Sequence, residues 1–104
     1  MPWGITDNEY ERLKLAFSHN PLISKVVLYG SRAKGNYKPF SDIDMTIVGD
    51  GLTRNDMNCL AGDIDELLLP YNIDLSLFAS LRNQELIDHI NRCGIVIYSR
   101  GERD

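Results

Sequence analysis

The sequence lacks the features that would place a protein in a membrane or outside the cell. Its two cysteines, Cys59 and Cys93, stand alone, which fits reduced, partly buried thiols better than a disulfide framework or a zinc site. No apolar run approaches the roughly 20 residues needed to span a bilayer. The first residues, Met-Pro-Trp-Gly, carry no basic side chain and precede no apolar stretch. We therefore expect a cytoplasmic protein without a secretory signal or membrane contact.

Positive charge is also scarce, and the net charge is −4. This balance argues against extended nucleic-acid binding, which depends on many contacts from Lys and Arg to phosphates. Between Lys14 and Asp42, however, the sequence has no acidic residue and four basic ones: Lys25, Arg32, Lys34 and Lys38. That segment could hold a small anion such as a triphosphate, whereas the acidic second half would repel a long polyanion.

Several common nucleotide- and metal-binding motifs are missing. Gly30 and Gly35 have the spacing of a Walker loop, but Asn36-Tyr37 follows where Lys-Ser/Thr is required, and there is no GxGxxG. The stretch around Asp42 and Asp44 lacks the glycine and terminal Glu of an EF-hand. His19 and His89 have no ligand companions at useful spacing, and we interpret both as surface or helix-end residues.

The apolar pattern predicts one α/β (α+β) domain over residues 1–104, with a core over about 5–98. Thr6 and Glu9 form a capping-box signature, and a second approximate one begins at Thr53. We expect a mixed sheet of about four strands with helices packed on it. The predicted order is helix 6–20, strand 24–29, loop 30–40 with room for one helical turn, strand 43–48, helix 53–69, strand 73–78, a helix through 86–90 capped by Gly94, and strand 95–98.

Three carboxylates fall where a carboxylate is costly. Asp42 and Asp44 lie at the mouth of a strand and, as residues i and i+2, project to the same face, about 7 Å apart. Asp74 lies between Ile73 and Leu75 in another apolar strand. Such charges repel one another unless a cation is bound, and magnesium prefers oxygen ligands. If the two strands are neighbours, the three carboxylates converge.

A glycine follows the first predicted strand directly. Gly30 would let the backbone approach a phosphate, and the Ser31 hydroxyl and N–H could donate to phosphate oxygens. A helical turn beginning there would add a partial positive charge, and Arg32 or Lys34 could neutralise a triphosphate. For Gly30 in isolation, a simple turn explains the residue equally well.

Together these residues resemble the signature of the DNA polymerase β-like nucleotidyltransferase superfamily. The signature is Gly-Ser, about ten residues, Asp-apolar-Asp, and an acidic residue on a later strand. Here it reads Gly30-Ser31, ten residues, Asp42-Ile43-Asp44, and then Asp74. The wording Gly-Ser-Arg-Ala-Lys-Gly and Ser-Asp-Ile-Asp is similar to the minimal nucleotidyltransferase (MNT) branch. The resemblance covers residues from about 5 to 98, and no required position is missing.

The resemblance implies a nucleotidyltransferase palm that moves a nucleoside monophosphate, AMP from ATP, to a hydroxyl acceptor. It implies that Asp42, Asp44 and Asp74 bind two Mg²⁺ ions, and Asp74 is a metal ligand, a general base or both. It assigns Gly30 and Ser31 to the β- and γ-phosphates, with Arg32 as a weaker candidate.

The resemblance also implies a partner, because minimal nucleotidyltransferases are commonly paired with HEPN-family toxins. We expect an antitoxin that modifies a toxin tyrosine and can form an oligomer with it. The alternatives are an antitoxin that acts by stoichiometric binding without catalysis, and a transferase acting on a small molecule or RNA. Tyr37 and Phe40 either cover the edge of the core or contact the acceptor protein.

Overall fold

A mixed four-stranded sheet forms the centre of the computed structural model, which describes residues 2–100. The strands are β1 (Lys25–Tyr29), β2 (Ile43–Val48), β3 (Ile73–Leu77) and β4 (Ile95–Ser99), in the spatial order β3-β2-β1-β4. β1 pairs antiparallel with β2 and β4, whereas β2 and β3 are parallel. The predicted fold class is therefore confirmed. No helix among the described residues is long and apolar enough to cross a membrane.

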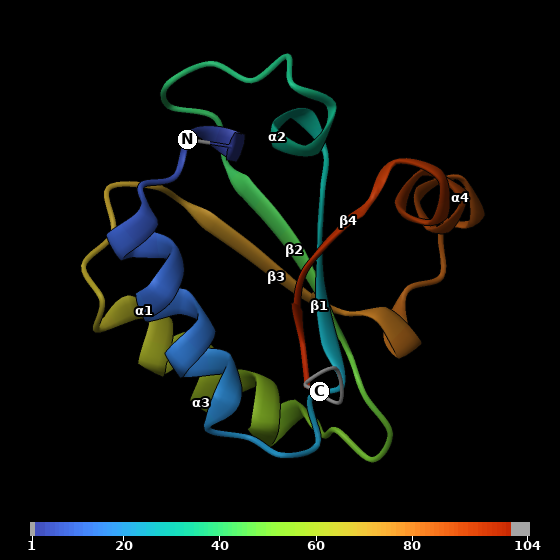
Figure 1. The fold of residues 1–104 in the computed structure, drawn as a ribbon. Helices are drawn as coiled ribbons and strands as arrows, with labels where there is room; N and C mark the ends of the chain where they lie inside the picture. Colours follow the sequence, from blue (N-terminus) through green and yellow to red (C-terminus); the bar gives the residue numbers. More distant parts are fainter. Residues whose placement is uncertain (1, 101–104) are drawn as a thin grey trace.

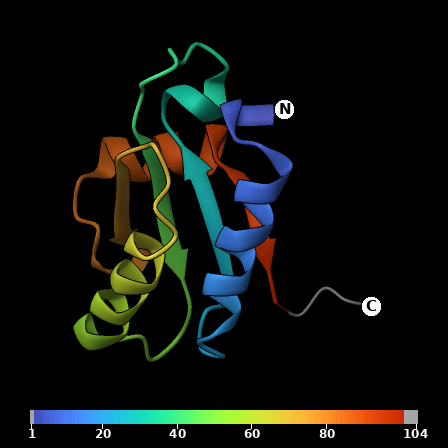
Figure 2. The ribbon, with the colours of Figure 1, turned by 90° about the vertical axis from the view of Figure 1, so that its left-hand side faces the viewer.

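The helices cover the two faces of the sheet unequally. α1 (Asp7–Ser18) and α3 (Arg54–Asp65) lie together on one face, and α4 (Gln84–Cys93) lies on the other. Figure 2, viewed from the side of α1 and α3, shows α4 behind the sheet. The short α2 (Ser31–Lys34) and the 3₁₀ turn η1 (Pro2–Gly4) sit above the end of β1; η2 (Phe78–Ser80) follows β3. α2 is the helical turn that the sequence allowed.

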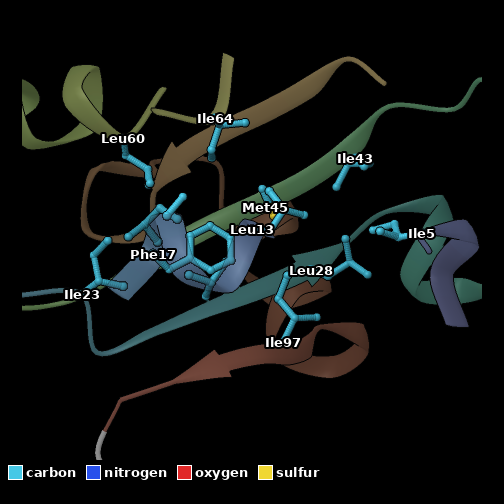
Figure 3. Close-up of a cluster of buried hydrophobic side chains, with 13 residues drawn as sticks. Ile5, Leu13, Phe17, Ile23, Leu28, Ile43, Met45, Leu60, Ile64 and Ile97 are labelled. Atoms are coloured by element: carbon cyan, nitrogen blue, oxygen red, sulfur yellow. The ribbon is translucent and has the colours of Figure 1, made fainter. Parts of the chain in front are cut away.

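The main core lies between the sheet and the α1–α3 pair. Figure 3 shows Phe17 and Leu13 of α1 beside Leu60 and Ile64 of α3, together with side chains of β1 and β2 such as Leu28 and Met45. Strand alternation supplies this face, since Ile43, Met45 and Ile47 are fully buried on β2. A smaller cluster on the opposite face joins Val27, Tyr29 and Ile90. Both expected capping boxes are present, at Thr6 with Glu9 and at Thr53 with Asp56.

Some boundaries differ from the sequence prediction. α3 ends at Asp65 instead of continuing to Leu69, because the chain tightens into a turn in which Leu68 has a left-handed φ of 54°. The turn leaves Leu68 exposed while Leu67 and Leu69 pack against the core. β3 ends one residue early, and Phe78 begins η2. Both cysteines are free, but Cys59 is exposed and only Cys93 is half-buried.

Candidate functional site

The three candidate carboxylates gather at one end of the sheet. Asp44 on β2 pairs in register with Asp74 on the parallel neighbour β3, and Asp42 stands two residues before Asp44. The parallel pairing of β2 and β3 produces this arrangement, because it brings the beginnings of both strands to the same end of the sheet. The last residue of β1 lies at that end too, since Tyr29 is the antiparallel partner of Asp44.

Burial separates Asp44 from the other two carboxylates. Asp44 is half-buried, whereas Asp42 and Asp74 are exposed. Burial raises the pKa of Asp44, and the negative charges of Asp74 and Asp42 raise it further. The expectation that all three carboxylates are costly was therefore wrong for Asp42 and Asp74. β3 is an edge strand, so Asp74 reaches water although its sequence neighbours are apolar.

Tyr29 shares the strand face of the carboxylates and is itself buried. Burial raises the pKa of the Tyr29 hydroxyl, and the charges of Asp74 and Asp44 act in the same direction. The Tyr29 side chain therefore stays uncharged beside Asp44.

The Gly30-Ser31 turn adjoins Asp44 directly. Gly30 has φ 78° and ψ −155°, a conformation that side chains disfavour, and a Cβ atom there would collide with the Asp44 carboxylate. Gly30 also accepts the hydrogen bond that closes α2, from the N–H of Lys34 at 3.1 Å. No side chain caps this turn, and Ser31 is half-buried at its start. Only glycine satisfies both the backbone angle and the contact.

Arg32 points away from this turn and serves the fold. Its side chain is 2% exposed. The guanidinium donates to the carbonyl oxygens of Trp3 (2.7 Å) and Ser41 (2.8 Å), and more weakly to that of Pro39 (3.4 Å). Arg32 therefore fastens the loop that leads to Asp42 onto the N-terminal turn, and we leave it out of the proposed nucleotide-binding set. Sequence alone could not reveal this, since its acceptors are backbone atoms of distant segments.

The two loop aromatics separate into one structural and one exposed residue. Tyr37 is half-buried, with its ring 5.0 Å from the Arg32 guanidinium carbon and close against Gly4. Phe40 is 91% exposed on the same loop. Tyr37 thus covers the core edge, and Phe40 is the aromatic that is free to meet another molecule.

His89 is the site residue that the sequence interpretation missed. It lies on α4, where its Nε2 accepts a hydrogen bond from the Gly30 N–H at 3.1 Å. Its ring stands edge-on to Tyr29, with 6.2 Å between centroids. No sequence spacing links His89 to Gly30, because the contact depends on how α4 docks.

The donor chemistry of this end of the sheet suits a divalent cation. A crowded, half-buried carboxylate gains from added positive charge, and carboxylate oxygens are the ligands that Mg²⁺ prefers. Among residues 2–100, no three His, Cys, Asp or Glu side chains are already arranged as a metal-binding group. Asp42 and Asp74 are exposed, so their rotamers are free to turn toward a cation beside Asp44.

Comparison with known families gives a match over nearly the whole chain. The family model described as "Polymerase beta, Nucleotidyltransferase" matches residues 11–103. That span includes the Gly30-Ser31 turn and all three carboxylates. A comparison with curated proteins finds no match.

Solved structures share the fold at low sequence identity. A chain in a toxin–antitoxin complex with AMP-PNP is 20% identical, with TM-score 0.69, over 94% of this chain and 77% of that one. A chain in a complex of tri-AMPylated Shewanella oneidensis HEPN toxin with MNT antitoxin is 21% identical, with TM-score 0.62, over 89% and 71%. A chain in a MntA–HepT toxin–antitoxin complex is 18% identical, with TM-score 0.65, over 91% and 74%.

Proposed function

We propose that this chain, which belongs to the polymerase β nucleotidyltransferase family, transfers AMP from ATP to a hydroxyl group of a partner protein. The observation that carries the proposal is the half-buried Asp44, crowded by Asp42 and Asp74 and in contact with the Gly30-Ser31 turn. A carboxylate cluster beside a glycine turn joins a cation site to a phosphate site. Metal-assisted transfer from a nucleoside triphosphate requires that combination.

Magnesium would be held by Asp42, Asp44 and Asp74. When bound, it neutralises phosphate charge and lowers the pKa of the acceptor hydroxyl. Asp44 is the fixed member of this set because it is half-buried within β2 and paired with Tyr29 of β1, and the two exposed carboxylates adjust around it. Two ions are the expected number.

The remaining residues bind the triphosphate and direct the reaction. The Ser31 hydroxyl and the uncapped N–H groups at the start of α2 donate to the β- and γ-phosphate oxygens. The acceptor oxygen forms a bond to the α-phosphorus as the α–β bridging bond breaks and pyrophosphate leaves. Asp74, exposed at the edge of the site, is the proposed acceptor of the hydroxyl proton.

A HEPN-family protein is the proposed acceptor, through a tyrosine. The site is open, since two of its three carboxylates are exposed, so an approaching protein can reach it and would exclude water on binding. One fold neighbour is a chain from a complex of AMPylated HEPN toxin with MNT antitoxin. The proposed role is thus an antitoxin that silences its partner by covalent modification.

The test is incubation of the purified chain with ATP labelled at the α-phosphate, Mg²⁺ and the product of the neighbouring gene, which the proposal expects to be a HEPN protein. We expect label on a partner tyrosine, located by mass spectrometry, and none when EDTA is added. Label on RNA or a small molecule instead would replace the protein acceptor. If Asp44→Asn still neutralises the partner fully without transferring label, the chain is a binding antitoxin and catalysis is not its function.

A further inference from the structure

The hydrogen bond between α4 and the Gly30 turn joins two parts of the chain that are far apart in sequence. The Gly30 N–H donates to His89 Nε2 at 3.1 Å, across 59 positions. His89 is half-buried, and the Tyr29 ring stands against its own ring. The imidazole thus packs against an aromatic ring on one side and accepts a hydrogen bond from a backbone N–H through Nε2.

That N–H belongs to the most adaptable residue of the site. Gly30 occupies φ 78° and ψ −155°, one of many conformations that glycine can adopt. Its peptide sets where β1 ends, where α2 begins and how closely the backbone approaches Asp44. A bond from a separate helix restricts this freedom, because rotation of the Tyr29–Gly30 peptide would break it.

The geometry also fixes the tautomer of the ring. A nitrogen that accepts from a backbone N–H carries no proton, so the proton of neutral His89 must lie on Nδ1. Packing against Tyr29 alone would not require either tautomer. The state of the two nitrogens therefore distinguishes a hydrogen-bonding role from simple filling of space.

We propose that His89 is a positioning residue, which holds the Tyr29–Gly30 peptide in the orientation that a nucleotide triphosphate meets. Its effect on nucleotide binding rests on the function proposed above, whereas its hold on the peptide does not. The residue touches neither substrate nor metal in this scheme. It acts through Gly30 by keeping the turn in one conformation before ATP arrives.

Three substitutions separate this role from packing. Glutamine places its amide oxygen the same number of bonds from Cα as Nε2, so His89→Gln keeps an acceptor for Gly30. His89→Asn places the oxygen at the position of Nδ1, and His89→Leu removes the acceptor. We expect His89→Gln to bind Mg-ATP like the unaltered chain. His89→Asn and His89→Leu should bind it roughly three- to tenfold more weakly, the effect of one hydrogen bond.

His19→Leu is the matched control, because this exposed histidine lies at the end of α1, beside Asp63. Calorimetric titration of each full-length variant with Mg-ATP gives the affinities, and partner labelling gives KM and kcat. In His89→Asn and His89→Leu we expect the KM for ATP to rise, with kcat changed less. The proposal is overturned if His89→Asn and His89→Leu bind like the unaltered chain, if His89→Gln is as weak as His89→Leu, or if any of them binds more tightly.

Nuclear magnetic resonance of the nucleotide-free chain tests the hold on the peptide independently of any activity. We expect a protonated, pyrrole-type nitrogen at Nδ1 of His89, a pyridine-type nitrogen at Nε2, and a Gly30 amide that exchanges faster in His89→Leu. The reverse tautomer, or unchanged exchange, would overturn the proposal. If the unaltered chain binds no Mg-ATP, the proposed function fails, and these spectra still decide whether His89 holds the peptide.

Discussion

The two faces of the sheet use the same strands in opposite ways. On β2, Ile43, Met45 and Ile47 enter the main core under α1 and α3, while the intervening Asp44 faces the site and Thr46 lies buried behind it. Burial on the first face stabilises the fold. On the second face, the same burial raises the pKa of a carboxylate and works against the apo protein. Neighbouring positions on one strand therefore have opposite roles: one stabilises the fold, and the next is held ready for a ligand.

The largest expected effect is on the core face. Phe17 is fully buried, so Phe17→Ala should lower the free energy of unfolding by about 3–5 kcal/mol. Chemical denaturation measures this change. Nucleotide affinity of the remaining folded protein should be nearly unchanged. A specific loss of affinity at equal stability would mean that the two faces are not separate in function.

Asp44→Asn, on the site face, should lower activity and raise the stability of the metal-free chain. Transfer should fall at least about a hundredfold, since metal-bound charge stabilisation contributes several kcal/mol. Because the pKa of Asp44 is raised in the folded chain, its ionised form costs stability as pH rises above the ordinary value of 3.8. Without metal at neutral pH, the variant should therefore gain up to about 1 kcal/mol, the scale of facing like charges on strands.

Melting curves with EDTA across pH check the stability change, with the exposed Asp50→Asn as control. The gain should disappear in acid, where Asp44 is protonated in both folded and unfolded states. A gain that persists there would show that charge crowding is not its cause.

Ser31→Ala tests the phosphate end of the site face. Loss of one hydroxyl donor should weaken ATP binding roughly three- to tenfold while leaving stability within about 0.5 kcal/mol. Titration calorimetry measures the affinity, and Mn²⁺ binding serves as the control that the carboxylates are intact. An affinity equal to that of the unaltered chain would remove Ser31 from the proposed site.

Phe40→Ala has the smallest expected effect on the fold. The side chain is 91% exposed, so unfolding should change by less than about 0.5 kcal/mol. If Phe40 contacts the acceptor protein, partner binding should weaken several-fold while ATP binding stays constant. Tyr37→Ala is the contrasting variant: it removes the ring that covers Arg32 and should lower the melting temperature. Unchanged partner affinity in Phe40→Ala would exclude this loop from the interface.

Local sequence rules predicted the elements of this chain well. Capping at Thr6 and Thr53 is a contact between residues three apart, and the buried strand at Lys25–Tyr29 follows from a short apolar run. The order of the elements and the mixed sheet followed from these signals. The end of α3 did not, because the apolar spacing continues through a turn at Leu68 and the first breaker, Pro70, comes two residues after it.

The residues of the candidate site could be predicted from the sequence, but their burial and hydrogen bonds could not. The pattern of Gly30, Asp42, Asp44 and Asp74 picked out residues that the pairing of β2 with β1 and β3 brings to one end of the sheet. Which carboxylate is half-buried depends on the position of each strand in the sheet. Arg32 holds the fold and His89 contacts the site because each side chain bonds to a backbone group far along the chain. Such contacts leave no periodic trace in one sequence.

The parallel pairing of β2 and β3 has a consequence for the time course of folding. Parallel neighbours cannot be joined by a tight hairpin, and here the connection passes through α3, so paired residues such as Thr46 and Ser76 are 30 positions apart. Pairings between distant segments are slow to form, since the entropy of closing the intervening loop must be overcome first. Asp44 and Asp74 come together only when this pairing has formed. A chain in which β2 and β3 have not paired would therefore lack the assembled carboxylate cluster.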